Sequence, residues 1–224
     1  MSPGLAAPRA AIFDWDNTLV DSWGCIREAL NSTLVAMDHE PWTEEMVKAR
    51  VALSLRDTFP AMFGTRWEEA RDIFYKRFEE IHIEWLRPLP GAEEMLIALA
   101  AMKIRLAVVS NKRGEFLRHE ARALGWDRLF DRLIGASDAA ADKPDPAPVR
   151  LALAACGVEA GEHVWFLGDA AVDLQCAVNA GCVPILLRAE PPGPEEFPTH
   201  PPRHHFAAFS YVTGLVRALA APIS

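Results

Sequence analysis

The sequence AAIFDWDNT occupies residues 10–18 and joins a short apolar run to two closely spaced carboxylates. Four further apolar runs of similar length occur at residues 104–109, 129–134, 164–167 and 183–187. Helical stretches lie between most of these runs, and such an alternation is typical of a parallel sheet covered by helices. The sequence therefore predicts an α/β fold, with a Rossmann-like parallel sheet as the middle layer of a three-layer α/β/α core.

Four helices of this fold have recognisable limits. We expect them at residues 93–101, 146–156, 172–180 and 211–220. The third is followed by Gly181, and glycine is the residue that most readily leaves a helix in the left-handed conformation.

The stretch between the first two apolar runs is unusually long. It holds about 90 residues, far more than a strand-to-helix connection needs. Two apolar stripes at helical spacing suit the packing faces of a small helical bundle. The stripes are Ile26, Leu30, Leu34 and Met37, and Phe74, Phe78, Ile81 and Trp85. We therefore expect a helical domain at residues 20–88, inserted into a core domain made of residues 1–19 and 89–224.

The composition excludes several classes of protein. Half of the 224 residues are apolar and 24% are charged, the balance of an ordinary globular protein. The net charge of -8 disfavours a nucleic acid partner. The four cysteines form no CxxC pair, which suits a reducing compartment. Since neither a signal peptide nor a membrane span is recognisable, we expect a cytoplasmic protein with no membrane partner. Both a monomer and a homodimer stay open, because the sequence does not indicate the oligomeric state.

Polar residues directly follow three of the apolar runs. Asp14 and Asp16 follow the first run, the SNK sequence of residues 110–112 follows the second, and Asp169 and Asp173 follow the fourth. The carboxyl ends of parallel strands gather along one edge of a sheet, where ligands bind. An extended backbone also turns side chains two residues apart to the same side. We therefore expect four carboxylates in one crevice.

Four carboxylates in one crevice require compensating positive charge, because close carboxylates repel each other. A hard divalent cation with oxygen ligands, Mg²⁺ above all, supplies that charge. Lys143 adds a fixed ammonium group if its loop reaches the same edge. Metal, lysine and hydroxyl groups together suit a phosphate. Each motif is common on its own, so the interpretation depends on their order and placement.

Taken in order, four motifs resemble the signature motifs of the haloacid dehalogenase-like hydrolase superfamily. They are DWDNT at residues 14–18, SNK at 110–112, KP at 143–144 and GDAAVD at 168–173. The helical insertion is similar to the α-helical cap domain of that superfamily, so the resemblance spans nearly the whole chain. Three other segments are similar to the phosphoglycolate phosphatase-like branch: PLPG at 88–91, KPDPAP at 143–148 and VALSLRDTF at 51–59.

The resemblance implies a phosphatase that works through an aspartyl-phosphate. Asp14 would be the nucleophile that attacks phosphorus. Asp16 would protonate the leaving group and then activate the water that hydrolyses the intermediate. Ser110 and Lys143 would bind the oxygens of the transferring phosphoryl group. The substrate would be a small soluble phosphomonoester of the phosphoglycolate kind.

The resemblance also implies metal and phosphate ligands. Mg²⁺ would be held by the carboxylates of Asp14 and Asp169 and by the backbone carbonyl of Asp16. Asp173 would complete or orient this set. Further contacts to the phosphate would come from the backbone near Thr18 and Asn111.

Two arginines of the insertion are candidates for substrate specificity, and three residues depart from the family pattern. Arg50 and Arg56 are candidates to bind a substrate carboxylate or a second phosphate, because guanidinium groups suit such anions. Asn17 stands where glycine is common, and asparagine tolerates a left-handed backbone. Ala170 replaces a commonly hydroxylated residue beside Asp169. Ala52 stands where related caps often carry glycine.

Alternative functions fit the same motifs. A sugar phosphomutase or a pyrophosphatase would use the same Asp14, Asp16, cation and lysine. A non-catalytic protein that binds a phosphorylated ligand is compatible with the fold alone, although both aspartates count against it. Asp16 also counts against a dehalogenase, which expels halide and needs no proton donor at that position.

Overall fold

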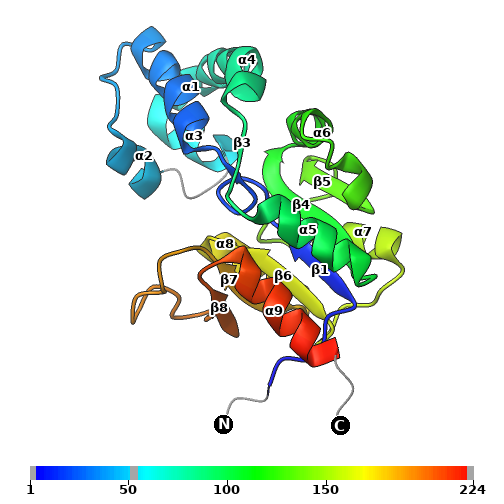
Figure 1. The fold of residues 1–224 in the computed structure, drawn as a ribbon. Coiled ribbons are helices and arrows are strands. Elements are labelled where there is room, and N and C mark those ends of the chain that lie inside the picture. Colours follow the sequence, from blue (N-terminus) through cyan, green and yellow to red (C-terminus); the bar gives the residue numbers. More distant parts are fainter. Residues whose placement is uncertain (1–3, 51–54, 221–224) are drawn as a thin grey trace. The chain divides into compact units, whose positions relative to one another are not determined.

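The computed structural model describes residues 4–50 and 55–220. The chain divides into two compact units (Figure 1). Met1–Leu19 and Pro88–Ser224 form the core unit, and Val20–Arg87 form the helical unit. Two short strands, β2 (Val20–Asp21) and β3 (Arg87–Pro88), pair with each other where the chain passes between the units.

The core unit is built on a six-stranded parallel sheet of order β5-β4-β1-β6-β7-β8. Its strands are β1 (Ala10–Phe13), β4 (Arg105–Arg113), β5 (Arg132–Ala136), β6 (Val164–Gly168), β7 (Val183–Leu187) and β8 (His204–Phe206). The central strands β1 and β6 are buried throughout, which explains why their sequences are continuous apolar runs. The prediction of a parallel α/β sheet is confirmed.

Helices cover both faces of this sheet. They are α5 (Ala92–Ala101), α6 (Gly114–Ala123), α7 (Ala147–Cys156), α8 (Ala171–Asn179) and α9 (Phe209–Ala220). On one face, Val149 and Leu153 of α7 join Ile12 and Phe166 of the strands in one buried cluster, which α8 extends with Cys176. On the other face α5 and α9 lie side by side (Figure 1). The three-layer arrangement thus buries the sheet from both sides.

Most predicted limits agree with the observed ones to within two residues, but two strands differ. The run predicted from residue 129 begins as a strand only at Arg132, because Leu129 ends the short 3₁₀ helix η2 (Asp127–Leu129). β4 continues past residue 109 to Arg113, through the polar SNK segment. Gly181 has a φ of 73°, the left-handed conformation expected after α8.

The helical unit contains α1 (Trp23–Ala36), α2 (Glu44–Arg50), α3 (Leu55–Phe63), η1 (Gly64–Arg66) and α4 (Trp67–Trp85). α1 packs against α4, and Leu30, Leu34, Phe74 and Phe78 are buried as the two stripes predict. Trp85 at the end of α4 is 38% exposed and continues the stripe only partly. No helix within the described ranges is both long and apolar enough to cross a membrane.

Candidate active site

The polar residues expected at the carboxyl ends of the strands do meet there. β1 pairs with both β4 and β6 in parallel, so the residues that follow these three strands emerge at the same edge of the sheet. The backbone N–H of Asp14 donates to the carbonyl of Leu167 at 2.9 Å and extends the ladder by one residue beyond Phe13. Asp14 therefore has a fixed backbone at the centre of the sheet.

Lys143 joins two of the aspartates in the interior of this edge. Its Nζ donates to Oδ1 of Asp14 and to Oδ1 of Asp173, each at 2.7 Å. All three residues are buried. Although burial lowers the pKa of Lys143, the two carboxylates raise it above its ordinary value, so the lysine stays protonated.

Asp169 completes an acidic cluster with Asp14 and Asp173. Each offers one carboxylate oxygen, and the three oxygens lie within 4.8 Å of one another. Burial raises the pKa of Asp14 to about 6 against the opposing effect of Lys143, and burial with the charge of Asp173 raises the pKa of Asp169 to about 8. One ammonium for three carboxylates leaves the cluster short of positive charge. Oxygen donors in this arrangement fit a hard divalent cation.

The local sequence explains how the cluster forms. Asp173 lies in the first turn of α8, where its Oδ2 accepts a hydrogen bond from the backbone N–H of Ala170 at 3.1 Å. A Cβ on Gly168 would collide with the side chain of Asp173, so glycine is required for this approach. Thr18, which is fully buried, donates its hydroxyl to Oδ1 of Asp169 at 3.0 Å. Asn17 has a φ of 60°, as expected for an asparagine in place of glycine.

The side chain of Asp16 pairs with a second lysine, Lys112, and not with Lys143. Among the described residues the acidic group comprises Asp14, Asp169 and Asp173, and the carboxylate of Asp16 instead lies 2.7 Å from Nζ of Lys112. Burial is the main cause of the raised pKa of Asp14, and the nearby charge of Asp16 adds to it, so Asp16 lies beside the compact cluster of three carboxylates. Burial lowers the pKa of Lys112, but Asp16 and Glu120 raise it further, and the net shift is upward. Lys112 belongs to the SNK motif, but the sequence assigned it no role, and Glu120 was not among the predicted site residues.

An irregularity of β4 places the SNK segment. Between Val109 and Arg113 the strand advances four residues while its partner β5 advances two, from Ile134 to Ala136. Such a bulge re-aims side chains at the end of a strand. Ser110 is buried there, and its Oγ accepts a hydrogen bond from the backbone N–H of Lys112 at 3.2 Å.

The side chain of Asn111 binds the loop that carries Lys143. Its Nδ2 donates to the carbonyl of Lys143 at 3.1 Å, and its Oδ1 accepts from the backbone N–H of Lys143 at 2.9 Å. These two bonds fix the backbone of Lys143 to the end of β4. The amide side chain is therefore engaged within the protein, and only the backbone of Asn111 remains as a candidate phosphate ligand.

Removing the Asn111 side chain breaks both hydrogen bonds to the backbone of Lys143 without removing any charge. If Lys143 binds the reacting group, as the family resemblance implies, we expect Asn111→Ala to lower kcat/KM on the order of 10- to 100-fold, because a small displacement of Lys143 weakens that contact. Asn179→Ala is the control, since Asn179 makes an exposed hydrogen bond of 2.9 Å to the carbonyl of Pro144 in the same loop. That variant should stay within about twofold of wild type. Wild-type kinetics for Asn111→Ala would contradict a positioning role.

The two arginines of the helical unit are placed unequally. Arg50 ends α2, is exposed, and has its guanidinium 4.6 Å from the ring centroid of Trp42. Arg56 belongs to α3, but its side chain lies outside the described part of the structure, as does Ala52. Ala170 is the residue before α8; its backbone N–H donates to Oδ2 of Asp173, and its carbonyl accepts from the backbone N–H of Asp173 at 3.1 Å.

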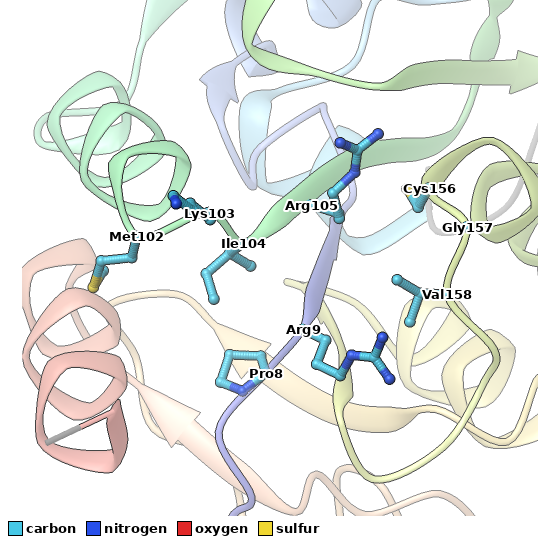
Figure 2. Close-up of a pocket in the computed structure, with 9 residues that line it drawn as sticks. All are labelled: Pro8, Arg9, Met102, Lys103, Ile104, Arg105, Cys156, Gly157 and Val158. Carbon is cyan, nitrogen blue, oxygen red and sulfur yellow. The ribbon is translucent and has the colours of Figure 1, made fainter. Parts of the chain in front are cut away.

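A separate cavity of about 540 Å³ lies at the opposite edge of the sheet (Figure 2). It is lined by residues 8–9, 102–105 and 156–158, which belong to the amino ends of β1 and β4 and to the end of α7. It contains none of the residues that the sequence singled out. The acidic cluster therefore remains the candidate active site.

The chain is similar to known hydrolases in sequence and in structure. The family model described as haloacid dehalogenase-like hydrolase matches residues 11–186. The chain is 36% identical over 193 residues to a phosphoglycolate phosphatase of Rhodospirillum rubrum, covering 80% of this chain and 79% of the relative. It is 32% identical over 222 residues to a phosphoglycolate phosphatase of Cereibacter sphaeroides, covering 94% and 98% of the two chains. A crystal structure of a predicted phosphoglycolate phosphatase from Haemophilus somnus superposes with a TM-score of 0.78 at 24% identity, covering 95% of this chain and 99% of that one.

Proposed function

Because the chain belongs to the haloacid dehalogenase-like hydrolase family and is a phosphoric monoester hydrolase, we propose that it uses Asp14 as nucleophile and Mg²⁺ as cofactor. The observation that carries this proposal is the buried bridge of Lys143 between Asp14 and Asp173, with Asp169 beside it. A lysine held against an aspartate at a sheet edge suits the transfer of a phosphoryl group to that aspartate.

The cation ligands in this proposal are the carboxylates of Asp14 and Asp169 and the backbone carbonyl of Asp16. Burial raises the pKa values of the two carboxyls to about 6 and about 8, so in their ionised form a bound cation would stabilise them. Asp173, whose oxygens are engaged by Lys143 and by the N–H of Ala170, orients this set. When bound, Mg²⁺ supplies positive charge beside the phosphoryl oxygens.

In the first step, an oxygen of Asp14 forms a bond to phosphorus as the bond to the ester oxygen breaks. Asp16 gives its proton to that ester oxygen, so the alcohol leaves in neutral form. Lys143, the hydroxyl of Ser110 and nearby backbone amides hold the phosphoryl oxygens and stabilise their charge. The products of this step are the free alcohol and an acyl phosphate on Asp14.

In the second step, water hydrolyses that acyl phosphate. Asp16, now ionised, takes a proton from the water as its oxygen attacks phosphorus and the bond to Asp14 breaks. Inorganic phosphate leaves and the Asp14 carboxylate is regenerated. The same residue thus acts first as an acid and then as a base.

The proposed substrate class rests on the relatives and on two arginines of the helical unit. Two relatives carry the name phosphoglycolate phosphatase, and we propose a small phosphomonoester of that kind for this chain. Arg50 and Arg56 are the candidates in the helical cap to bind a substrate carboxylate. A cytoplasmic location suits the proposal, because the four cysteines are buried thiols.

Phosphate release from a panel of substrates tests the proposal. The panel contains 2-phosphoglycolate, sugar phosphates, 4-nitrophenyl phosphate and pyrophosphate, each with Mg²⁺ and then with EDTA. We expect release from one or a few monoesters that stops in EDTA. Release from pyrophosphate alone would identify a pyrophosphatase. Absence of release from the whole panel by a folded protein would favour a mutase or a binding protein.

The raised pKa values of Asp14 and Asp169 also predict how the thermal stability of the metal-free protein depends on pH. Asp14 and Asp169 bind protons more tightly in the folded protein than in the unfolded chain, with pKa values raised from 3.8 to about 6 and about 8. From about pH 4 to about pH 8 the folded protein binds more protons at these two carboxyls than the unfolded chain does. The contribution of the two carboxyls to the free energy of unfolding therefore falls as pH rises through this range. Thermal unfolding of the metal-free protein should therefore show a lower midpoint at pH 8 than at pH 5.

Added Mg²⁺ should reverse this loss. At a concentration one hundred times its Kd it stabilises by about 2.7 kcal/mol, which raises the midpoint by roughly 5–10 °C in a protein of this size. The effect should be smaller at pH 5, where protons compete for the carboxylates. Asp169→Asn is the control and should lose most of the Mg²⁺ effect. Equal Mg²⁺ effects at both pH values would contradict the proposed ligands.

A further inference from the structure

A buried lysine and a buried glutamate, Lys112 and Glu120, are linked to Asp16, and the proposed steps use neither of them. Nζ of Lys112 lies 2.7 Å from Oδ1 of Asp16 and donates to both carboxylate oxygens of Glu120, at 2.8 and 2.7 Å. The side chains of Lys112 and Glu120 are only 5% and 2% exposed. The same carboxylate of Glu120 accepts a hydrogen bond of 2.7 Å from the indole N–H of Trp15.

This group is held rigidly by its surroundings. Trp15 is fully buried and contacts Trp126 edge-on, with their ring centroids 5.9 Å apart. Glu120 lies on the buried face of α6 beside Phe116 and Leu117. An ammonium has three N–H donors, so Glu120 can take two while the third faces Asp16. Glu120 thereby holds the ammonium of Lys112 in place, and the remaining N–H of that ammonium faces the carboxylate of Asp16.

Stability alone does not account for such an arrangement. A buried ion pair is often no more stabilising than apolar residues of similar volume, because both charges lose their hydration. On α6, Glu120 shares the buried face with Phe116 and Leu117, so its charge is not needed to fill that face. The group does, however, fix the direction of one carboxylate at the edge of the site, and orientation of a reacting group strongly affects rate.

We propose that Lys112, anchored by Glu120 and Trp15, is a positioning residue that holds the carboxyl group of Asp16 in place for proton transfer to the leaving group and from the attacking water. This inference rests on the proposed function. Lys112 touches neither the substrate nor the cation in this account. Its backbone N–H also binds Ser110 Oγ, so the same residue ties the acid and base to the phosphate-binding hydroxyl.

The test is the double variant Lys112→Met with Glu120→Gln. It removes the two charges together, so no unpaired charge of the pair stays buried, and glutamine can still accept the bond from Trp15. With 2-phosphoglycolate and Mg²⁺ we expect kcat to fall on the order of 10- to 100-fold with little change in KM, because proton transfer is no longer well aligned.

A substrate whose leaving group needs no proton separates the two steps. With 4-nitrophenyl phosphate the first step should survive in the double variant while the second, which needs Asp16 as base, stays slow. We therefore expect a burst of nitrophenolate approaching one equivalent per enzyme, followed by slow turnover. A purely structural lesion would reduce both substrates alike and give no burst, and that result would overturn the inference.

Two further variants serve as controls for the double variant. Arg66→Met with Glu69→Gln removes an exposed ion pair of 2.9 Å at the start of α4 and should behave as wild type. If the double variant does not fold, Glu120→Gln alone keeps Lys112 and should show the same pattern with a smaller loss. A wild-type protein inactive on both esters would refute the proposed function, whereas an active wild type with unaffected variants would refute only the role of Lys112.

Discussion

Replacing Asp14 with asparagine is expected to abolish turnover, by roughly 10⁴-fold or more, while leaving the fold intact. The amide cannot form the bond to phosphorus that a carboxylate oxygen forms. The free energy of unfolding should stay near the wild-type value, because asparagine has the same shape and removes a buried carboxyl whose pKa is raised to about 6 by burial. Phosphate release and urea unfolding measure the two effects separately.

The matched control for this variant is Asp72→Asn. Asp72 lies on α4 with a side chain 70% exposed, so the same chemical change there should alter neither rate nor stability. Unchanged activity in the Asp14 variant would end the mechanism proposed here. Loss of folding in that variant would instead indicate that Asp14 is needed chiefly to balance Lys143.

Removal of Lys143 should cost both activity and stability. We expect Lys143→Met to lower kcat/KM by about 10³-fold or more, since the phosphoryl oxygens lose a fixed positive charge. It should also destabilise the protein by about 3–5 kcal/mol, because Asp14 and Asp173 lose their shared partner in a buried site. The midpoint of urea unfolding in EDTA measures the second effect without contribution from a cation.

A double variant separates the two roles of the lysine. Lys143→Met with Asp173→Asn removes opposite charges together, so most of the lost stability should return. Activity should not return, because no ammonium then faces the phosphoryl group. Recovery of both would show that Lys143 merely neutralises its neighbours and would contradict its part in catalysis.

The convergence of the acidic residues could be predicted because it follows from sheet geometry. β1 and β6 are continuous apolar runs that end in Asp14 and in Gly168-Asp169, and parallel neighbours end at the same edge. Lys143 could be included only conditionally, since nothing in the sequence fixes where its loop lies. The reciprocal bonds between Asn111 and Lys143 join residues 32 positions apart and have no local signature.

The pairing of Asp16 could not be predicted for a different reason. The extended-backbone rule places the side chains of Asp14 and Asp16 on one side, but the direction of each carboxylate depends on its partner. The partner of Asp16 is Lys112, which is placed by the bulge that follows Val109 in β4. Glu120 did leave a signal, since it is a charged residue in line with the apolar face of α6, and a buried charge implies a buried partner.

The sixth strand illustrates the limit of pattern reading. β8 comprises only His204–Phe206, follows a proline-rich segment, and has one fully buried side chain, that of Phe206. Three residues give too short a pattern for an alternation to be recognised. The two histidines lie next to each other on this strand, and Nε2 of His205 lies 2.8 Å from the carbonyl of Arg188.

Trapping the phosphorylated enzyme tests the central claim most directly. The protein is mixed with 2-phosphoglycolate and Mg²⁺, quenched in acid during turnover, treated with borohydride to reduce any acyl phosphate, digested, and mapped by mass spectrometry. The account predicts reduction of Asp14 to homoserine in the wild type, at a higher level in the Lys112→Met and Glu120→Gln double variant, and none in Asp14→Asn. Full turnover with Asp14 unmodified, or modification of a different residue, would contradict it.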